Sequence, residues 1–480
     1  RNSLRIASRE KQHHTHPSLR LHVSRTKVNE ETQTSSQDDW WKTHEFTHAD
    51  VAEQARSDFP ILSRTVGTEH KPLIYLDSAA TSQKPASVVD DLSKYYETYN
   101  SNVHRGAHLL SRDATAAYEA SRDLIAELIH AYSRNEVVFT SGATEAINLV
   151  ANSYGRQHVN KGEEIVLSEI EHHSNLVPWQ MLAEETGAIL KYAKIDVNTG
   201  GLDQAHFESL LTEKTKIVGF QHVSNVMGCI NPVEKMVEMV RRKSPHAKIL
   251  LDACQSVPHM KVDVQDLGVD FVAASGHKMC GPTGIGFLWA PEALLNSMPP
   301  FLGGGEMIDQ VTLEGSTFAP APARFEAGTP AIAQAIGLGS AVSYLNKIGL
   351  DRIEAYEHEL AHYMYKRLSE IDGVTVFGPP AGAPRAALCA FVCQQVHPSD
   401  LSTFLDMEGV AIRAGHHCCQ PLHHALGYSH SARASLYFYN TKEDVDKFIE
   451  YLQQTLDFFG NMGDGDELGE SGDDGFVPFI

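Results

Sequence analysis

The feature that most constrains the fold is a regular alternation of short apolar runs with longer amphipathic runs between residues 73 and 290. The amphipathic runs, for example 87–99, 114–131 and 232–242, have the apolar spacing of helices. The apolar runs have the length and composition of buried strands, and they cover residues 73–76, 136–140, 164–167, 188–192, 217–220, 248–251, 271–274 and 286–289. This alternation predicts a mainly parallel sheet covered on both faces by helices. In such a sheet the chemistry lies in loops at the carboxyl ends of the strands.

The rest of the chain predicts a second, smaller domain. A glycine- and proline-rich stretch at 299–330 interrupts the alternation, and a long helical pattern follows over 332–371. Strand candidates then occur at 374–377 and 387–392. We therefore predict an α/β protein with a large domain over 73–330, a connecting helix over 331–371, a small α+β C-terminal domain over 372–459, and an N-terminal arm of that small domain over 38–72.

Composition narrows the class of protein. The 480 residues are 42% hydrophobic and 21% charged, which is typical of a globular protein. A formal net charge of −21 argues against general nucleic-acid binding, which requires a basic surface. No apolar run is long enough to cross a bilayer, so we expect no membrane span. Seven cysteines, an odd number scattered over a long chain, favour a reducing compartment over a disulfide framework.

The two ends of the chain differ from its middle. Residues 1–28 contain a single acid, Glu10, against the basic residues Arg1, Arg5, Arg9, Lys11, Arg20, Arg25 and Lys27. We interpret residues 1–37 as an organelle transit segment, and a disordered basic tail is the alternative. Residues 460–480 contain six acids and no Lys or Arg, which predicts a flexible, solvated tail without a catalytic role.

Lys278 lies in a turn between two apolar runs, and residues 273–289 read Ala-Ala-Ser-Gly-His-Lys-Met-Cys-Gly-Pro-Thr-Gly-Ile-Gly-Phe-Leu-Trp. A lysine at a strand end, beside Ser275 and His277, is well placed to form a Schiff base. Pyridoxal phosphate requires such a lysine, an acid for its ring nitrogen and donors for its phosphate. A lone lysine in a turn is usually a solvated charge, so the interpretation depends on those partners.

Asp252 supplies the acid at the end of the apolar run 248–251. A carboxylate facing a pyridine nitrogen keeps that nitrogen protonated, which makes the ring an electron sink. Gln255 follows three residues later and would hydrogen-bond the phenolic oxygen of the same ring. Taken alone, an Asp at the end of a strand is more typical of a helix N-cap.

Two further strand ends supply a phosphate site and a ring neighbour. The stretch 140–146, Thr-Ser-Gly-Ala-Thr-Glu-Ala, opens a helix whose N-terminus would bind phosphate with help from Thr144. Simple capping is the alternative there. His172 follows the run 164–167 and would stack on the ring, although a surface histidine is the default interpretation. A phosphate site, a ring neighbour, an acid and a lysine in this order resemble the fold-type I pyridoxal phosphate enzymes, specifically the class V aminotransferase group.

A second constellation surrounds Cys418, where residues 413–423 read Arg-Ala-Gly-His-His-Cys-Cys-Gln-Pro-Leu-His. Neighbouring histidines and arginine favour the thiolate, which is the reactive form of cysteine. Arg433, farther along the chain, would bind an amino-acid carboxylate through two parallel hydrogen bonds. A buried structural cysteine and a salt-bridged arginine are the alternatives.

The Cys418 stretch resembles the Arg-x-Gly-His-His-Cys-x-x-Pro signature of group II cysteine desulfurases of the Suf type, which also act as selenocysteine lyases. The likeness runs from about residue 75 to 451 and includes Tyr-Leu-Asp-Ser-Ala-Ala at 75–80, Asn-Val-His-Arg-Gly-Ala-His at 102–108, Arg-Phe-Glu-Ala-Gly-Thr-Pro at 324–330 and Tyr-Asn-Thr at 439–441. Group I desulfurases carry their cysteine in a longer, serine-rich loop that this sequence lacks.

The resemblance implies a role for each site residue. Lys278 would hold the cofactor, Cys418 would form the persulfide, and His172 would stack on the ring. Further cofactor contacts are implied for Thr144, Asp252, Gln255, Ser275, His277 and, from the second subunit of a homodimer, Thr329. Substrate contacts are implied for Asn225, Arg413, Arg433, His108 and Ala79.

The family's reaction converts L-cysteine to L-alanine and leaves the sulfur on the enzyme. The resemblance therefore implies a SufE-like sulfur-acceptor protein and the Suf scaffold as partners, iron–sulfur cluster assembly as the purpose, and L-selenocysteine as a second substrate. Combined with the basic N-terminal segment, it implies the plastid stroma as location, with the mitochondrion as the alternative.

The sequence departs from the family pattern at two positions. Ala143 stands where many bacterial relatives have a second threonine, so one phosphate contact is in doubt. Cys419 follows the nucleophile directly, where the family usually has a residue without a thiol. It would accept sulfur, form a vicinal disulfide or have no role, and we expect no role.

Other readings remain open. One keeps the cofactor but makes the protein another class V aminotransferase or lyase in which Cys418 is structural. Another is a zinc-binding module formed by His416, His417, Cys418, Cys419, His423 and His424. Adjacent residues cannot easily converge on one tetrahedral ion, so we expect no metal. A scaffold without chemistry is disfavoured because lysine, aspartate and cysteine are all present.

Overall fold

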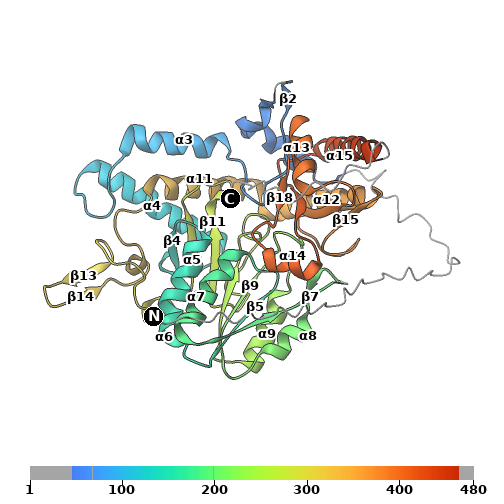
Figure 1. The fold of residues 1–480 in the computed structure, drawn as a ribbon. Coiled ribbons are helices and arrows are strands. Elements are labelled where there is room, and N and C mark those ends of the chain that lie inside the picture. The colour runs from blue at the N-terminus through green and yellow to red at the C-terminus, as the bar shows by residue number, and fades with distance from the viewer. Residues whose placement is uncertain (1–45, 68, 198, 464–480) are drawn as a thin grey trace, which may run out of the picture. The chain divides into compact units, whose positions relative to one another are not determined.

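The computed structural model describes residues 46–67, 69–197 and 199–463. Its centre is a seven-stranded sheet (Figure 1). In spatial order the strands are β4 (Val137–Thr140), β12 (Gly286–Trp289), β11 (Phe271–Ser275), β10 (Lys248–Asp252), β9 (Thr215–Gln221), β5 (Glu164–Ser168) and β6 (Ile189–Ala193). All neighbouring pairs are parallel except the two made by β12. The predicted mainly parallel sheet is confirmed.

Continuous burial explains why these segments form the central sheet. Every residue of β4, β5, β11 and β12 is buried. Because successive side chains of a strand point to opposite faces, both faces of the sheet must be covered. Valine, isoleucine, leucine and phenylalanine suit such a doubly buried sheet.

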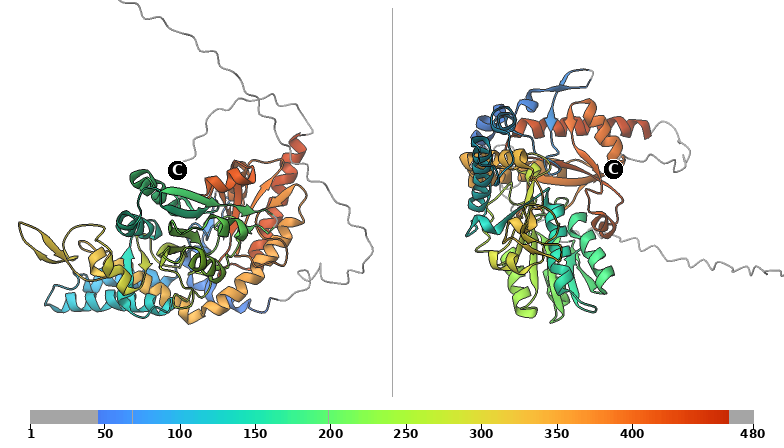
Figure 2. Two further views of the ribbon diagram at one scale, coloured as in Figure 1. Left: turned by 90° about the horizontal axis from the view of Figure 1, so that it is seen from below. Right: turned by 90° about the vertical axis from the view of Figure 1, so that its left-hand side faces the viewer.

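Helices provide that cover. They are α3 (Ala86–Lys94), α4 (Leu109–Leu128), α5 (Ala143–Val150), α7 (Val177–Thr186), α8 (Gln204–Leu210), α9 (Val233–Lys243), α10 (Glu292–Ser297) and α11 (Ile332–Ile348). Helix α5 packs against β11 and β12, and α7 packs against β6. Helices α3, α4 and α11 lie side by side (Figures 1 and 2). Helix α9 buries Val233, Met236, Val237 and Val240, which share one helical face.

A second, antiparallel sheet has four strands, which in spatial order are β15 (Val374–Val376), β16 (Leu388–Cys393), β19 (Ser431–Ser435) and β18 (Arg413–Gly415). The helices of this part are α12 (Leu350–Ser369), α13 (Pro398–Met407), α14 (Gln420–Leu426) and α15 (Lys442–Gly463). This arrangement agrees with the predicted small α+β unit. All five residues of β19 are buried, so Arg433 is held inside the protein.

Residues 73–76 do not join the large sheet as the sequence predicted. They contain the short strand β3 (Ile74–Tyr75), which pairs in parallel with β17 (Val410–Ala411). The segment therefore belongs to the smaller part, although the sequence placed the start of the large domain at residue 73. An apolar run indicates burial but does not specify the strand with which it pairs. The other predicted domain limits stay predictions.

The connecting helix is two helices. The continuous helical pattern predicted over 332–371 is interrupted at Gly349, whose φ of +94° lies in the left-handed region that favours glycine. Helix α11 ends before it and α12 begins after it. The tail predicted from residue 460 overlaps α15, which continues to Gly463, and residues 464–480 lie outside the described part.

The remaining elements are short. They are α2 (Asp50–Ala55), α6 (Arg156–His158), β1 (Thr65–Val66), β2 (Lys71–Pro72), β7 (Ile195–Asp196), β8 (Gly201–Leu202), β13 (Ile308–Val311), β14 (Ser316–Phe318), and the single turns η1 (Arg56–Asp58), η2 (Pro60–Ser63), η3 (Tyr95–Tyr99), η4 (Arg134–Glu136), η5 (Ala151–Gly155), η6 (His173–Asn175), η7 (Gly276–Lys278) and η8 (Ala323–Phe325). The hairpin β13–β14 projects away from the sheets (Figures 1 and 2), and Val311 and Leu313 on it are exposed.

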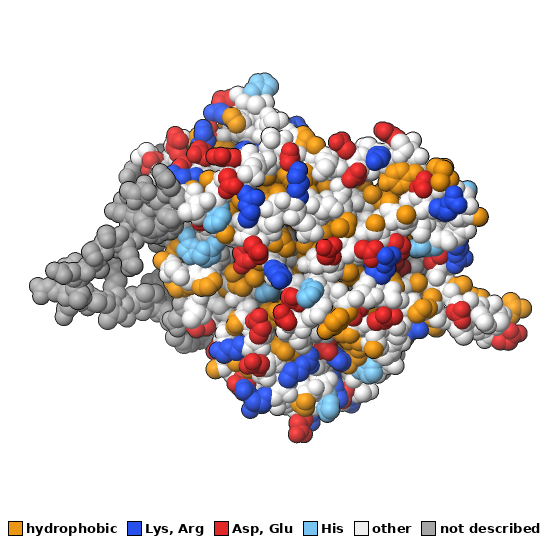
Figure 3. All heavy atoms as spheres, turned by 180° about the vertical axis from the view of Figure 1, so that it is seen from behind, with side chains coloured by type: hydrophobic (Ala, Val, Ile, Leu, Met, Phe, Trp, Pro, Cys, Tyr) orange, Lys and Arg blue, Asp and Glu red, His pale blue; other side chains and the backbone are white. Residues whose placement is uncertain are grey.

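Within the described residues, no helix is long and apolar enough to cross a membrane. On the face shown in Figure 3, basic side chains are dispersed among acidic ones and form no basic stripe. The predicted transit segment, residues 1–37, lies outside the described residues.

Candidate active site

The carboxyl ends of the strands of the large sheet open into one cavity, which the small antiparallel sheet helps to enclose. The cavity is lined by all the site residues predicted from sequence except His108 and Thr329, namely Ala79, Thr144, His172, Asn225, Asp252, Gln255, Ser275, His277, Lys278, Arg413, Cys418 and Arg433. Its lining combines three cationic side chains, one carboxylate and three hydroxyls, which are those of Lys278, Arg413, Arg433, Asp252, Thr144, Ser174 and Ser275. Such a lining suits a small ligand with several charged groups.

Lys278 ends the turn η7, which directly follows β11. The segment 81–84 holds this turn through the carbonyl oxygen of His277. That oxygen accepts hydrogen bonds from Thr81 Oγ1 at 3.0 Å, the Ser82 N–H at 3.1 Å and Lys84 Nζ at 3.0 Å. The backbone beside Lys278 is thereby fixed. Burial, with a smaller effect of the Lys278 charge, lowers the pKa of His277 to about 4.

Asp252 is the last residue of β10 and is almost completely buried. Its Oδ1 accepts a hydrogen bond from the Cys254 N–H at 3.0 Å, which fixes the carboxylate at the cavity wall. Gln255 is also buried, and its Nε2 donates to the carbonyl oxygen of Ala79 at 2.8 Å. An acid and an amide therefore face the same cavity as Lys278.

The start of α5 is built as an anion site. The first N–H groups of a helix have no partner within the helix and attract anions. The Ala143 N–H donates to Ser275 Oγ at 2.9 Å, which joins this helix start to the Lys278 turn. A side chain at Gly286 would place its Cβ 2.6 Å from the Cα of Gly142, so glycine permits the close approach of β12. Thr144 adds a hydroxyl at the cavity wall.

His172 lies directly before the turn η6, and its ring orientation is set by Ser174. The Ser174 N–H donates to His172 Nδ1 at 3.1 Å, and Ser174 Oγ lies 2.7 Å from the same nitrogen. Because Nδ1 accepts a hydrogen bond, the proton of the neutral ring lies on Nε2. Burial, together with the charge of Lys278, lowers the pKa of His172 to about 4.

Cys418 lies in a strained loop at the mouth of the cavity. His417 and Cys418 have φ values of +51° and +57°, which non-glycine residues adopt at a cost of roughly 1 kcal/mol or more each. The Cys418 carbonyl oxygen accepts a hydrogen bond from the His173 N–H at 2.8 Å. The side chain of Cys418 is half-buried and lines the cavity.

Arg433 is buried and makes one ion pair. Its Nη2 donates to Asp77 Oδ1 at 2.8 Å, and its Nη1 donates to the Asn225 carbonyl oxygen at 3.1 Å. Its Nε has no hydrogen-bond partner among the described residues. Burial lowers the pKa of the guanidinium, and Asp77 opposes that shift. Arg413 lies half-buried in the same wall. A ligand carboxylate would therefore meet two guanidinium groups here.

The structure does not bring His108 and Thr329 to the cavity of their own chain. His108 caps α4, where its Nδ1 accepts the Ser111 N–H at 3.3 Å. Thr329 is exposed. The sequence placed Thr329 in the cavity of a second subunit, and that placement stays a prediction.

Sequence reasoning gave no role to Asp77, Lys84 or Ser174. Asp77 lies in the family-like stretch 75–80, and its position directly after an apolar run was a usable signal. Nothing in the sequence signals the contact of Lys84 with His277, because it joins two loops far apart in the chain, whereas Ser174 contacts His172 only two residues before it. The predicted alternative of a zinc module has no geometric support, since no three His, Cys, Asp or Glu side chains in the described part could hold a metal ion together.

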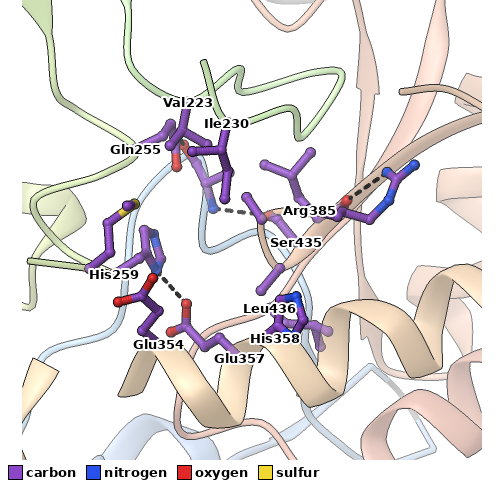
Figure 4. A pocket seen from close by; sticks show the side chains of 15 residues that line it. Val223, Ile230, Gln255, His259, Glu354, Glu357, His358, Arg385, Ser435 and Leu436 are labelled. Atoms are coloured by element: carbon purple, nitrogen blue, oxygen red, sulfur yellow. Dashed lines mark hydrogen bonds and ion pairs between the residues drawn. The ribbon is translucent and has the colours of Figure 1, made fainter. Parts of the chain in front are cut away.

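A second cavity, drawn in Figure 4, shares Ala79, Val223 and Gln255 with the first. Its lining contains a buried ion pair, in which His259 Nδ1 lies 2.8 Å from Glu357 Oε2. Burial raises the pKa of Glu357, and His259 opposes the shift. The lining also contains Gln255, Glu354, His358, Arg385 and Ser435 but neither a lysine nor a cysteine, so we assign the chemistry to the first cavity, which has both.

Comparison with known proteins identifies the family to which the chain belongs. The family model described as aminotransferase class-V matches residues 74–448. The chain is 52% identical over 412 residues to a probable cysteine desulfurase of Synechocystis sp., covering 86% of this chain and 97% of that protein. It is 51% identical to a probable cysteine desulfurase of Streptomyces coelicolor, covering 85% and 98%. The crystal structure of the cysteine desulfurase CsdA from Escherichia coli matches with a TM-score of 0.78 at 36% identity, covering 85% and 99%.

Proposed function

Because the chain belongs to the class-V aminotransferase family, and within it to the cysteine desulfurases, we propose that it converts L-cysteine to L-alanine and receives the sulfur on Cys418. The observation that carries the proposal is that Lys278, Asp252 and Cys418 line one cavity. The lysine and the aspartate are the residues that pyridoxal phosphate requires, and a half-buried cysteine on a separate loop can accept the sulfur of the substrate.

The cofactor is pyridoxal phosphate, and the donor set of the cavity fits it. The start of α5, with Thr144 and Ser275, would hold the phosphate. Asp252 would face the ring nitrogen, and His172 would lie against the ring. When bound, pyridoxal phosphate withdraws electrons from the α-carbon of an amino acid. The Ala143 N–H donates to Ser275 Oγ and position 143 has no hydroxyl, so Thr144 and Ser275 would supply the side-chain contacts to the phosphate.

Each residue then has one task in the reaction. The Asp252 carboxylate keeps a proton on the ring nitrogen, and the Lys278 amine removes the proton from the substrate α-carbon. Arg433 and Arg413 bind the substrate carboxylate. The Cys418 thiolate attacks the substrate sulfur, the carbon–sulfur bond breaks, and its electron pair stays with the carbon skeleton, which takes up protons to become alanine.

Replacement of Cys418 tests this proposal. In Cys418→Ser, alanine and sulfide formation from cysteine should fall to background, while the visible absorbance of the bound cofactor stays unchanged. In Lys278→Ala that absorbance should change and activity should also be lost. Full desulfurase activity in Cys418→Ser, or cysteine turnover that requires a keto acid, would instead support another class V aminotransferase or lyase.

We further propose a Suf-type enzyme that delivers sulfur to a SufE-like acceptor and the Suf scaffold for iron–sulfur cluster assembly. The Cys418 loop supports this, because it is short and the Cys418 carbonyl oxygen is held by the His173 N–H. Cys418 therefore cannot move far, and an acceptor protein has to come to it. Addition of such an acceptor should raise turnover several-fold. Selenocysteine lyase activity is also proposed, and it should persist in Cys418→Ser because carbon–selenium bonds break more readily.

We propose that the enzyme is a homodimer in which Thr329 and His108 complete the partner's cavity. Their exposed positions outside their own cavity support this, as do the apolar side chains Val311 and Leu313 on the exposed hairpin. Sedimentation should give a dimer. If the sites are shared, a mixed dimer of one Lys278→Ala and one Thr329→Ala protomer has one intact site out of two. Mixing the two inactive variants should therefore restore about a quarter to a half of the wild-type activity.

We propose the plastid stroma as location, with the mitochondrion as the alternative. The basic, acid-poor composition of residues 1–28 supports an organelle address. Residues 1–40 fused to a fluorescent protein should accumulate in plastids, and accumulation in mitochondria or the cytosol would contradict the proposal.

A further inference from the structure

Cys419, the residue next to the nucleophile, is completely buried in an apolar cluster with Ile170, Met227, Cys229 and Leu422. Its Sγ lies 3.2 Å from Asn225 Oδ1 and 3.9 Å from the Ile170 carbonyl oxygen. Two cysteines adjacent in sequence thus have opposite environments, since Cys418 faces the cavity and Cys419 faces the core.

The hydrogen bonds of Asn225 define the protonation of Cys419. Asn225 Nδ2 donates to the His417 carbonyl oxygen at 2.8 Å, and a carbonyl oxygen accepts only. The amide oxygen must therefore point toward Cys419, and it also accepts only. The short contact between Asn225 Oδ1 and Cys419 Sγ is then satisfied only if the thiol donates its proton. Burial raises the pKa of Cys419, which favours the same protonated form.

This arrangement holds the loop on which the nucleophile lies. His417 and Cys418 both have left-handed backbone conformations, which persist only when the surroundings fix them. The His417 carbonyl oxygen is held by Asn225, and the Cys418 carbonyl oxygen is held by the His173 N–H at 2.8 Å. Cys419 Sγ donates to the other end of the same amide, and so supports the orientation in which Asn225 Nδ2 reaches the His417 carbonyl oxygen.

We propose that Cys419 is a positioning residue, whose thiol proton orients Asn225 so that Asn225 holds the Cys418 loop in its reactive conformation. It is not a second sulfur acceptor, because a thiol that donates its proton to Asn225 in the core is neither a thiolate nor within reach of the cavity. The inference rests on the proposed role of Cys418 and assigns a function to a residue for which the sequence predicted none.

Alkylation of Cys418 tests the positioning role without depending on turnover. In the pyridoxal phosphate-loaded enzyme, iodoacetamide modification of Cys418 is followed by peptide mass mapping. Cys419→Ala removes the donor, so the loosened loop should be alkylated about threefold faster or more, while kcat falls about threefold to tenfold. Cys419→Ser keeps a donor and should stay within about twofold of wild type in both measurements.

Cys229→Ala is the matched control, because it removes a buried thiol from the same apolar cluster. If Cys419 had only a structural role, Cys419→Ala would lower kcat and thermal stability as Cys229→Ala does, and Cys418 would not be alkylated faster. Equal alkylation and kcat in Cys419→Ala and wild type, or equal effects of Cys419→Ala and Cys419→Ser, would overturn the proposal.

Sulfur mapping separates this inference from the proposed function. After cysteine is added without an acceptor, the extra sulfur should be found on Cys418 and not on Cys419, and Cys418→Ser should carry none on Cys419. Sulfur on Cys419 would overturn the inference while leaving desulfurase activity intact. Absence of alanine and of sulfur on both cysteines, with the alkylation pattern as expected, would overturn the proposed function instead.

Discussion

Asp77 Oδ1 lies 2.8 Å from Arg433 Nη2, and this pair joins the segment that follows β3 to β19 of the four-stranded sheet. Arg433 is buried, so its charge depends on a nearby carboxylate. A substrate carboxylate that binds Arg433 would share the guanidinium with Asp77. The pair thus links protein stability to substrate binding.

Asp77→Asn should therefore destabilise the substrate-free enzyme by about 2 kcal/mol, because it leaves a buried cation without its partner. A saturating amino acid such as L-alanine should restore part of that loss by supplying a carboxylate. Thermal unfolding with and without L-alanine checks the prediction, and Asp77→Glu, which keeps the charge, is the control. An equal ligand-induced shift in wild type and Asp77→Asn would count against it.

The protein should lose stability in mild acid. Burial lowers the pKa of His172 and of His222 to about 4, below the usual 6.5. The stability due to these neutral rings is fully present above pH 6.5 and is lost as the pH falls toward 4, because the unfolded chain binds protons there that the folded chain does not. At pH 5 the loss should be about 1–2 kcal/mol per histidine.

Urea unfolding at pH 7 and pH 5 measures this loss. His222→Gln should show a smaller difference between the two pH values than wild type, since one of the titrating rings is gone. The same difference in both proteins would argue that other groups cause the acid sensitivity.

Lys84 should matter for catalysis although it does not line the cavity. Its Nζ donates to the His277 carbonyl oxygen at 3.0 Å and to Thr81 Oγ1 at 3.2 Å, so it fixes the turn that carries Lys278. Lys84→Met keeps the volume and removes the donors. We expect kcat to fall about tenfold with cofactor absorbance retained, and we expect no change in the exposed control Lys94→Met.

The pH dependence of stability offers an independent test of Lys84. Burial lowers its pKa to about 8, below the usual 10.5. The folded protein should therefore gain stability from this group as the pH rises from 8 toward 10.5, because the unfolded chain retains a proton that the folded chain releases. Lys84→Met should remove that part of the slope.

The pair His259–Glu357 in the second cavity (Figure 4) should show strong coupling. His259→Ala leaves a buried carboxylate unpaired and should cost about 3 kcal/mol of unfolding free energy. Adding Glu357→Gln should recover part of that loss, since the unpaired charge is then removed. Additive effects of the two substitutions in urea unfolding would show that the ion pair contributes little.

The large sheet was predictable because its strands are doubly buried. Residues 271–275 and 286–289 are apolar or small throughout, and such runs between helical patterns have few alternatives. The cavity was predictable for the same reason, since Asp252 and Lys278 closely follow strands whose carboxyl ends meet at one edge.

What the sequence could not predict depends on packing between distant segments. Residues 73–76 are as apolar as a central strand, yet they pair with Val410 and Ala411. The donation of Lys84 to His277 and that of Cys419 to Asn225 are made between loops, where no periodicity exists. Gly349 lies inside the helical pattern predicted over 332–371, and only its left-handed φ reveals the break.

The pairing of β3 with β17 has a consequence for the order in which the enzyme is completed during synthesis. The Ala79 N–H donates to Ser435 Oγ across 356 residues of chain, so this wall of the cavity closes only after residue 435 has left the ribosome. The strands that carry Asp252 and Lys278 are complete much earlier in translation. A nascent chain would thus have Asp252 and Lys278 in place before Arg413 and Arg433, for which we propose binding of the substrate carboxylate.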